Sequence, residues 1–377
     1  MSFDRAAFAD KIRRSMEHLG VDGNEVMVGT GIPEARFLIL RAGSADPTGD
    51  EVLTLADYFD SDYKFFISNE RLAAFEETDS LYRKHGELFS KSDRRAIQQF
   101  LYLCECESWL WKSNPHRSES FGFAPQGSNF KRQGHAAASE LRSHFGYRDD
   151  QIPSDLFRDI RKLGIHVFRR KLENSSISGV MIRHPEAGRC ILVNYDEDVY
   201  RQRFTAAHEL AHALMEDSEF NVSLSRDGSN LIEVRANAFA SHYLIPPVFA
   251  RSVLTRIATW NDTTIIEWAK RLKVSTEVLR ISLKEQRIID NITFNQLKGS
   301  RVPRDQKIDP EIGSETGRTR DRKLSLLQRG LSMRYVNECL EALDNRRISH
   351  ARAAEMLMVR EDEMGEIKAL FTVSGAQ

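Results

Sequence analysis

The chain has 377 residues, with 41% hydrophobic and 29% charged side chains and a formal net charge of −1, values typical of a folded globular protein. This length exceeds one ordinary hydrophobic core and predicts two or three domains. The near-zero charge excludes steering of the whole molecule toward nucleic acid, although it leaves room for local asymmetry.

Membrane and disulfide-bonded classes are not expected either. No apolar stretch approaches the ~20 residues that cross a bilayer, and the N-terminus has no signal-peptide hydrophobic region. The four cysteines, Cys104, Cys106, Cys190 and Cys339, are scattered through apolar or helical segments, as reduced thiols are. We therefore expect a cytoplasmic protein with no membrane partner.

Residues 1–70 predict a small all-α domain. Phe8, Ile12, Met16 and Leu19 repeat at helical spacing, and Gly20 ends that helix. Shorter helices are expected at 25–28, from Glu34 onward and at 52–59. Because a glycine-containing turn joins the second helix to the third, where Pro33 marks the helix start, the pattern predicts a helix-turn-helix unit.

This segment resembles the helix-turn-helix domains of the XRE family. The residues in that family's register are Leu19-Gly20, Thr30-Gly31-Ile32, Gly43, Pro47 and Leu55-Ala56. The resemblance implies contact with operator DNA, for which Arg36 and Arg41 are the candidates, since phosphate neutralisation supplies much of DNA affinity. Glu34 and Ile39, however, stand where a DNA reader usually carries Gln, Ser, Thr, Lys or Arg. The alternative is a helix-turn-helix kept as a protein-interaction or dimerisation module.

Residues 71–115 predict a helical connector with a packed apolar face, and the Pro/Gly/Ser-rich segment 114–127 predicts a domain boundary. A helix over 130–145 and strands at 165–168, 178–182 and 190–194 follow. With the helices described next, they predict an α+β domain over 130–297 that contains a small antiparallel sheet. We expect strand 190–194 to flank a cleft and to pair with an extended peptide.

A His-Glu-x-x-His motif occupies His208 to His212. Residues four apart lie on one face of a helix, so the two imidazoles can bind one Zn²⁺ while Glu209, beside them, accepts the proton of the attacking water. Small apolar flanking residues favour a helix buried in a core. Glu233, in the first turn of the next helical segment, completes a His₂Glu set with an open fourth position, as in catalytic zinc sites. The alternative is a helix with two polar residues capped by solvent.

The two segments together resemble the ImmA/IrrE family of metallo-endopeptidases. The second motif is the run Glu233-Val-Arg-Ala-Asn-Ala-Phe-Ala240, closed by Leu244-Ile-Pro246, and the family commonly has Gly at the position of Ala211. The resemblance implies zinc ligands at His208, His212 and Glu233 and a general base at Glu209. XRE domains commonly precede such peptidases, which supports both assignments.

We therefore expect a zinc-dependent regulatory endopeptidase, linked to transcription regulation, stress response or a toxin-antitoxin pair. The expected partners are a protein substrate such as a repressor, operator DNA, a toxin encoded nearby and a second copy of the chain. The alternative is a non-proteolytic transcription regulator or an antitoxin-like protein that binds DNA or a toxin. Glu209 favours the peptidase, because a purely structural zinc site has no need of it.

Three further segments complete the chain. His242 lies nine residues past Glu233, about half a turn round the helix, so we expect it to face away from the metal and to be hydrogen-bonded. Residues 298–323 predict a basic, solvated linker. Residues 324–377 predict a small helical module.

Overall fold

The structure of the protein, a computed structural model, describes residues 3–59, 61, 63–67, 81, 86–113, 118–153, 155–216, 220–224, 230–312 and 317–372. The chain divides into two compact units, Met1–Tyr102 and Leu103–Gln377. Within the described ranges, no helix combines the length and the apolar character that crossing a bilayer requires.

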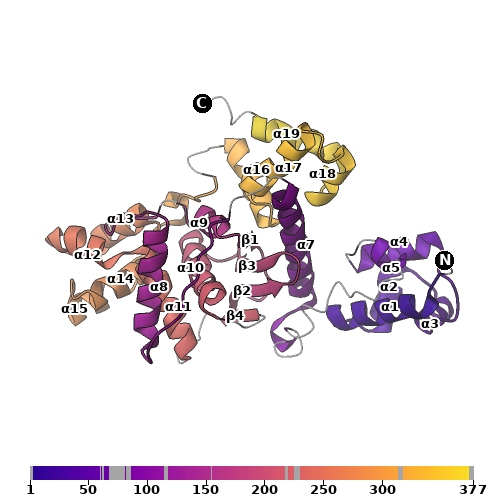
Figure 1. The fold of residues 1–377 in the computed structure, drawn as a ribbon, viewed down its shortest axis with the longest axis horizontal. Coiled ribbons are helices and arrows are strands. Elements are labelled where there is room, and N and C mark those ends of the chain that lie inside the picture. Colours follow the sequence, from indigo (N-terminus) through magenta and orange to yellow (C-terminus); the bar gives the residue numbers. More distant parts are fainter. Residues whose placement is uncertain are drawn as a thin grey trace. The chain divides into compact units, whose positions relative to one another are not determined.

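The first unit is all-α (Figure 1). Its helices are α1 (Arg5–Leu19), α2 (Gly23–Thr30), α3 (Glu34–Arg41), α4 (Gly49–Tyr58), α5 (Tyr63–Ile67) and the 3₁₀ turn η1 (Gly86–Leu88). All four helices expected between residues 8 and 59 are present. The predicted connector, residues 71–115, lies partly outside the described residues, and its described part contains η1 and α7 (Lys91–Ser113).

Local sequence signals set the ends of these helices. Asp22 and Thr48 are the N-cap residues of α2 and α4, and each forms a capping box with the glutamate three positions on, Glu25 and Glu51. Gly31 ends α2 with a φ of 69°, a left-handed conformation that suits glycine. The apolar faces meet in one core that includes Phe8, Ile12, Leu19, Val26, Phe37, Leu40 and Leu55.

The second unit contains helices around one small sheet. After the C-terminal part of α7 it contains, in chain order, α8 (Phe130–His144), α9 (Leu156–Lys162), β1 (His166–Arg170), β2 (Ile177–His184), β3 (Gly188–Asn194), α10 (Val199–Met215), β4 (Phe220–Leu224), α11 (Leu231–Leu244), α12 (Pro247–Val253), η2 (Leu254–Arg256), α13 (Asp262–Leu272), α14 (Thr276–Glu285), α15 (Asn291–Gln296), η3 (Arg304–Gln306), α16 (Gly317–Gln328), α17 (Met333–Asp344), α18 (His350–Met356), η4 (Glu361–Glu363) and α19 (Met364–Thr372). The predicted α+β class is confirmed.

The sheet has the strand order β1-β3-β2-β4 and is mixed. Strands β2 and β3 form an antiparallel hairpin, and β4 pairs antiparallel with β2. We expected a wholly antiparallel sheet, and this expectation is wrong at one edge. There β1 pairs parallel with β3, in the register His166↔Cys190. The reason is that the β2–β3 hairpin places its second strand beside β1, so that β3 runs in the same direction as β1.

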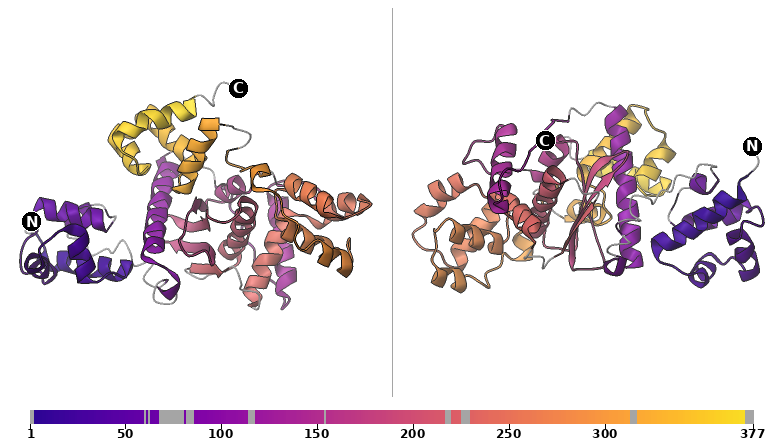
Figure 2. Two further views of the ribbon diagram at one scale, coloured as in Figure 1. Left: turned by 180° about the vertical axis from the view of Figure 1, so that it is seen from behind. Right: turned by 60° about the horizontal axis from the view of Figure 1, so that its bottom comes forward.

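Helices cover both faces of this sheet (Figure 2). On one face, Trp111 of α7 stacks on His166 of β1 with ring centroids 4.3 Å apart. On the other face, Val167 and Ile191 join the core that also contains Leu210 of α10. Because both faces are covered, β2 and β3 are buried along most of their length, without the alternation of buried and exposed residues that a half-exposed sheet shows.

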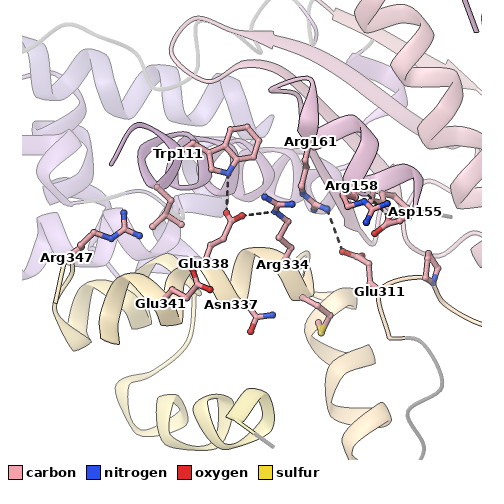
Figure 3. Close-up of a pocket in the computed structure, with 14 residues that line it drawn as sticks. Trp111, Asp155, Arg158, Arg161, Glu311, Arg334, Asn337, Glu338, Glu341 and Arg347 are labelled. Carbon is pink, nitrogen blue, oxygen red and sulfur yellow. Dashed lines mark hydrogen bonds and ion pairs between the residues drawn. The ribbon is translucent and has the colours of Figure 1, made fainter. Parts of the chain in front are cut away.

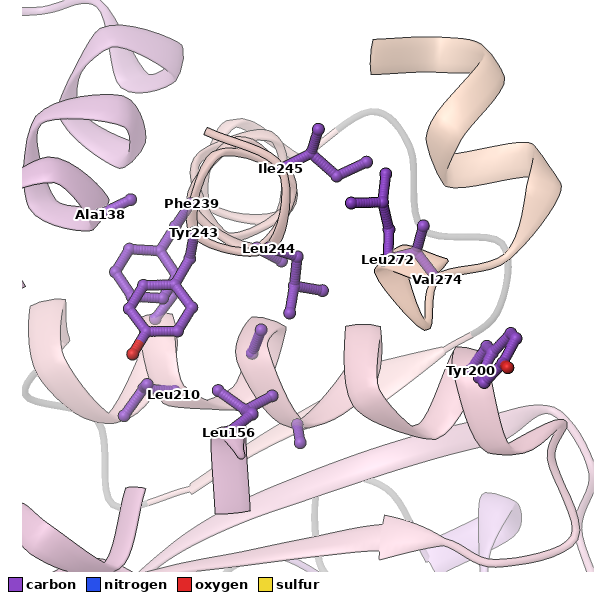
Figure 4. Packing of buried hydrophobic residues seen from close by; sticks show 14 of the residues in the cluster. Ala138, Leu156, Tyr200, Leu210, Phe239, Tyr243, Leu244, Ile245, Leu272 and Val274 are labelled. Carbon is purple, nitrogen blue, oxygen red and sulfur yellow. The ribbon is translucent and has the colours of Figure 1, made fainter. Parts of the chain in front are cut away.

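Helix α10 lies between the sheet and α11. Figure 4 shows Leu210 of α10 facing Phe239 and Tyr243 of α11, with Ala138 of α8 on the same side of α11 as Phe239. Helices α8 and α11 approach closely because α8 has glycine at the contact, where a methyl group on Gly134 would lie 2.3 Å from the Arg235 carbonyl oxygen. This packing fixes α11 against α10 and thereby positions the side chains described below.

Within the second unit, the C-terminal helix α17 packs near α7 and α9. A cavity of about 740 Å³ lies between α7, α9 and α17, and Figure 3 shows the residues that line it. Ion pairs and hydrogen bonds join its walls, including Trp111 Nε1 to Glu338 at 3.2 Å. Residues 298–312, expected as part of a solvated linker, supply Asp309 and Glu311 to the buried Arg169 of β1, with the Asp309 contact at 2.7 Å.

Candidate metal centre

Helix α10 presents the His-Glu-x-x-His motif from a buried position. The Asp198 side chain caps its N-terminus by accepting from Tyr200 N, and small residues such as Ala207 and Ala211 let the helix lie close to its neighbours. His208 and His212 are both buried, as is Glu233 in the first turn of α11. The flanking residues predicted a helix that is buried in a core, and this prediction is confirmed.

Three side chains converge at one point. His208 Nε2 lies 3.0 Å from His212 Nε2 and 3.0 Å from a Glu233 oxygen, and His212 Nε2 lies 3.3 Å from the other Glu233 oxygen. One ligand atom from each residue falls within 4.8 Å of the other two. Across the described ranges, no other group of three His, Cys, Asp or Glu side chains converges in this way.

The outer nitrogens of both imidazoles indicate their protonation. His208 Nδ1 lies 3.0 Å from Asn237 Oδ1, and His212 Nδ1 lies 2.9 Å from a Glu216 carboxylate oxygen. Because these two oxygens are acceptors, each Nδ1 carries the proton and each Nε2 presents a lone pair. The Asn221 amide nitrogen also lies 3.0 Å from His212 Nδ1, and it donates instead to the Glu216 carboxylate at 3.5 Å. Two lone pairs and a carboxylate facing one point repel each other unless a cation lies between them, so this donor set fits a metal ion.

Without a cation, protons must take that role. Burial opposes a charge on His212, but hydrogen bonds to Glu216 and Glu233 outweigh it and raise the pKa of His212 to about 10. Burial favours the neutral form of Glu233, but hydrogen bonds from His208 and His212 outweigh it and lower the pKa of Glu233 to about 2. Both shifts show how strongly the cluster attracts positive charge.

Glu209 lies beside the cluster with its carboxylate bare. The residue is fully buried, and among the residues that the structure describes neither carboxylate oxygen has a hydrogen-bond partner. Burial raises the pKa of Glu209, although His212 and His208 oppose the rise. A buried, unpartnered carboxylate is costly, so its position next to three metal-ligand-type side chains fits a group that exchanges a proton with a bound water.

Comparison with known proteins identifies the domain around this cluster. Residues 160–284 match the M78 peptidase family, described as the IrrE N-terminal-like domain. The match is confined to this domain of the 377-residue chain. The family resemblance seen in the sequence is thereby confirmed, and a metallopeptidase family implies a bound metal.

The chain also matches a curated relative. Over 148 residues, the chain is 28% identical to the radiation response metalloprotease IrrE of Deinococcus radiodurans. The aligned part covers 37% of this chain and 44% of the relative, so the chain spans less than half the length of the curated relative that it matches.

The domain supports the cluster with residues for which the motifs predicted no role. Arg235 of α11 holds Glu216 at 3.1 Å, and Arg183 of β2 donates to the Glu216 carbonyl at 2.8 Å. A sequence signal existed for two of the supporting residues: Glu216 lies four positions after His212, and Asn237 lies four positions after Glu233, on the same helix faces.

Gly179 of β2 is a further requirement. A methyl group there would lie 2.7 Å from a Glu209 oxygen and 2.8 Å from Thr205 Cγ2, both too close. A glycine within a strand signals such a close approach, and here it makes room for the Glu209 carboxylate.

The strand beside the cluster is β4. We expected the strand at 190–194 to pair with a peptide, but this expectation is wrong, because β3 lies between β1 and β2 and both its edges are already paired. Strand β4 is the edge strand on this side, and its Asn221 Nδ2 lies 3.0 Å from His212 Nδ1. His242 contacts Ser139 Oγ at 3.0 Å and stacks on His135, so its predicted hydrogen-bonded position away from the cluster is confirmed.

The two candidate DNA contacts differ in their surroundings. Arg36 donates to both Glu51 oxygens, at 2.7 and 2.8 Å, and to the Asp46 carbonyl at 2.8 Å. Its guanidinium is thus engaged within the first unit. Arg41 is exposed at the end of α3. DNA binding by these residues stays a prediction.

Proposed function

We propose that the protein is a zinc-dependent endopeptidase that cleaves a regulatory protein such as a repressor, and that its N-terminal unit is an XRE-type helix-turn-helix domain. The observation that carries the proposal is the convergence of two imidazole lone pairs and a carboxylate beside the bare carboxylate of Glu209. A structural zinc site commonly uses four protein ligands, whereas a catalytic site uses three and keeps one position open.

The roles of the residues follow from this geometry. His208, His212 and Glu233 would hold the zinc ion, whose chemistry when bound is to polarise a scissile carbonyl and to lower the pKa of water from about 16 toward ~7. Glu209 accepts a proton from the attacking water and returns it to the leaving amine. Asn237 and Glu216 keep the two imidazoles in the tautomer that presents Nε2.

Substrate binding is proposed at the edge of β4. Within the described residues, only one edge of β4 is paired, with β2. An extended peptide that adds to the other edge receives main-chain hydrogen bonds and passes close to His212, since Asn221 of this strand contacts that histidine. This geometry favours an unfolded segment or loop of the substrate protein.

The variant Glu209→Gln tests the proposal. The amide has nearly the same shape but accepts no proton, so we expect normal zinc content and cleavage lowered by about 10²–10⁴-fold. Because the substrate is to be identified, cells producing the wild type or the variant are compared for new protein N-termini by mass spectrometry. Termini that depend on Glu209 support the peptidase and name its substrate.

The alternative has its own outcome. If wild type and variant bind zinc equally and yield the same set of protein N-termini, the peptidase proposal is wrong. The non-proteolytic regulator, a protein that binds DNA or a toxin, then remains.

A further inference from the structure

Helix α3 of the first unit has an apolar outer face. Ala35, Leu38, Ile39 and Ala42 follow the spacing of one side of a helix, and all four are exposed. Leu38 is 51% and Ile39 43% exposed. We call these four residues, with Glu34 and Arg41 at their edge, the α3 face. The opposite side of the helix, with Phe37 and Leu40, is fully buried in the core of the unit.

This face is poorly suited to reading DNA. Base edges in the major groove are read mainly by polar donors and acceptors, and the middle of the α3 face offers only apolar groups. Glu34 repels phosphates, and Arg36 is already bound to Glu51. Exposed neighbouring apolar side chains are instead typical of a protein contact.

The charges at the edge of the face identify the partner. Glu34 and Arg41 are seven residues apart, two helical turns, so they lie on the same edge. Within the described structure, neither side chain has a hydrogen bond or ion pair with another residue. When two identical helices pack antiparallel across a two-fold axis, each edge faces the same edge of the partner, running in the opposite direction. Glu34 then lies opposite the partner's Arg41, and the pair occurs twice.

We propose that the α3 face is a self-association surface for a second copy of this chain, whose own α3 packs on it antiparallel. Leu38 lies at the centre of the contact, and Glu34 pairs with the partner's Arg41. A parallel arrangement would oppose the charged edge to the apolar Ile39 edge, so the charge pattern selects the antiparallel one. The inference does not depend on the peptidase proposal.

The size of the face sets the strength of the contact. An eight-residue helix is about 12 Å long, and a stable interface usually buries about 1,200–2,000 Å². We therefore expect a dimer that dissociates on dilution, with a dissociation constant on the order of tens of micromolar or weaker. Such a dimer brings two chains together only where their local concentration is high.

Sedimentation of the full-length protein over a range of concentrations tests the proposal. Leu38→Glu places charges at the centre of the contact and should weaken association by at least about tenfold. The matched control is Leu53→Glu, which alters a leucine of α4 that is 55% exposed, and it should associate like the wild type. Both leucines are exposed, so neither change disturbs the core, and circular dichroism verifies this.

A charge exchange makes the test specific. Glu34→Arg alone and Arg41→Glu alone each turn two attractive pairs into two repulsive ones and should weaken association about tenfold. The double exchange Glu34→Arg with Arg41→Glu restores both ion pairs. It should return the dissociation constant of the dimer to within about threefold of the wild-type value.

Three results would overturn the proposal. The first is a wild type that stays monomeric at millimolar concentration, and the second is a dimer that Leu38→Glu leaves intact. The third is a double exchange that associates no more tightly than either single variant. A gel shift with the promoter DNA of the gene is run in parallel. Loss of DNA binding in Leu38→Glu, without any self-association of the wild type, would assign the face to DNA instead.

Discussion

Helices α10 and α3 both lie where the sequence carries a functional motif, yet their polar side chains differ in what surrounds them. In α10, His208 and His212 meet Glu233 at one point, and each imidazole has an acceptor behind it. In α3, Arg36 turns inward to Glu51, and the outer face is apolar. A metal site depends on a few side chains at fixed spacing, so the motif carries the chemistry with it. The fold of the first unit depends mainly on its buried core, so it does not require particular side chains on the outer face of α3.

Removing a ligand should produce the largest effect. His208→Ala or Glu233→Ala leaves two protein ligands, and we expect zinc content to fall from about one per chain to near zero by elemental analysis. His242→Ala is the control, because this histidine bonds Ser139 away from the cluster, and it should retain its zinc. A zinc content equal to that of the wild type in either ligand variant would show that the proposed set of ligands is wrong. Helix α10 would then differ from α3 only in its burial.

The sequence predicted the structure of these two regions only in part. It predicted the four N-terminal helices, strands β1 to β3 and the helices of the motif from spacing and caps, because these signals are local. It missed β4, whose five residues include the polar Asn221 and Ser223 and form a strand only by pairing with β2. It also missed the order of the strands, which depends on contacts between distant segments.

The space around Glu209 should produce the next effect. Gly179→Ala places a methyl group 2.7 Å from a Glu209 oxygen, and displacement of a reacting group by about 1 Å can lower a rate about 10²-fold. We expect cleavage to fall by about that factor while zinc content stays normal. Gly122→Ala, where no atom lies within 4 Å of the added methyl group, should be neutral. Equal activity of the two variants would show that the carboxylate tolerates movement.

The support behind His212 should matter less than the ligand itself. Arg235→Met removes the guanidinium that holds Glu216, so the His212 imidazole is oriented less well, and we expect zinc affinity to fall about tenfold. Competition with a chelator at neutral pH measures this directly, without any substrate. Arg251→Met, which removes a hydrogen bond to Gln286 at 3.0 Å, should leave the affinity unchanged. An unchanged zinc affinity in Arg235→Met would show that the contact between Arg235 and Glu216 does not influence metal binding.

The smallest effect on stability should come from replacing Arg36, the arginine of α3 whose side chain points toward Glu51. Hydrogen bonds from Arg36 lower the pKa of Glu51 to about 2, from an ordinary 4.5. A carboxyl with a depressed pKa stabilises the folded state above its ordinary pKa, and this contribution is lost as the pH falls from about 4.5 to about 2. Partly exposed ion pairs contribute at most about 1 kcal/mol, so Arg36→Ala should speed amide hydrogen exchange in α3 and α4 about fivefold at pH 7.

The pH dependence separates this role from DNA contact. At pH 2 most of the difference between the wild type and Arg36→Ala should be lost, once intrinsic rates are corrected, because Glu51 is then about half protonated in the wild type and largely protonated in the variant. Arg41→Ala is the matched change on the same helix, and since Arg41 has no ion pair within the described structure, it should leave exchange unaltered at every pH. If Arg36→Ala exchanges like the wild type at pH 7, the pair with Glu51 contributes nothing to stability. Arg36 is then free to turn outward, and the contrast between α3 and α10 narrows to the apolar face alone.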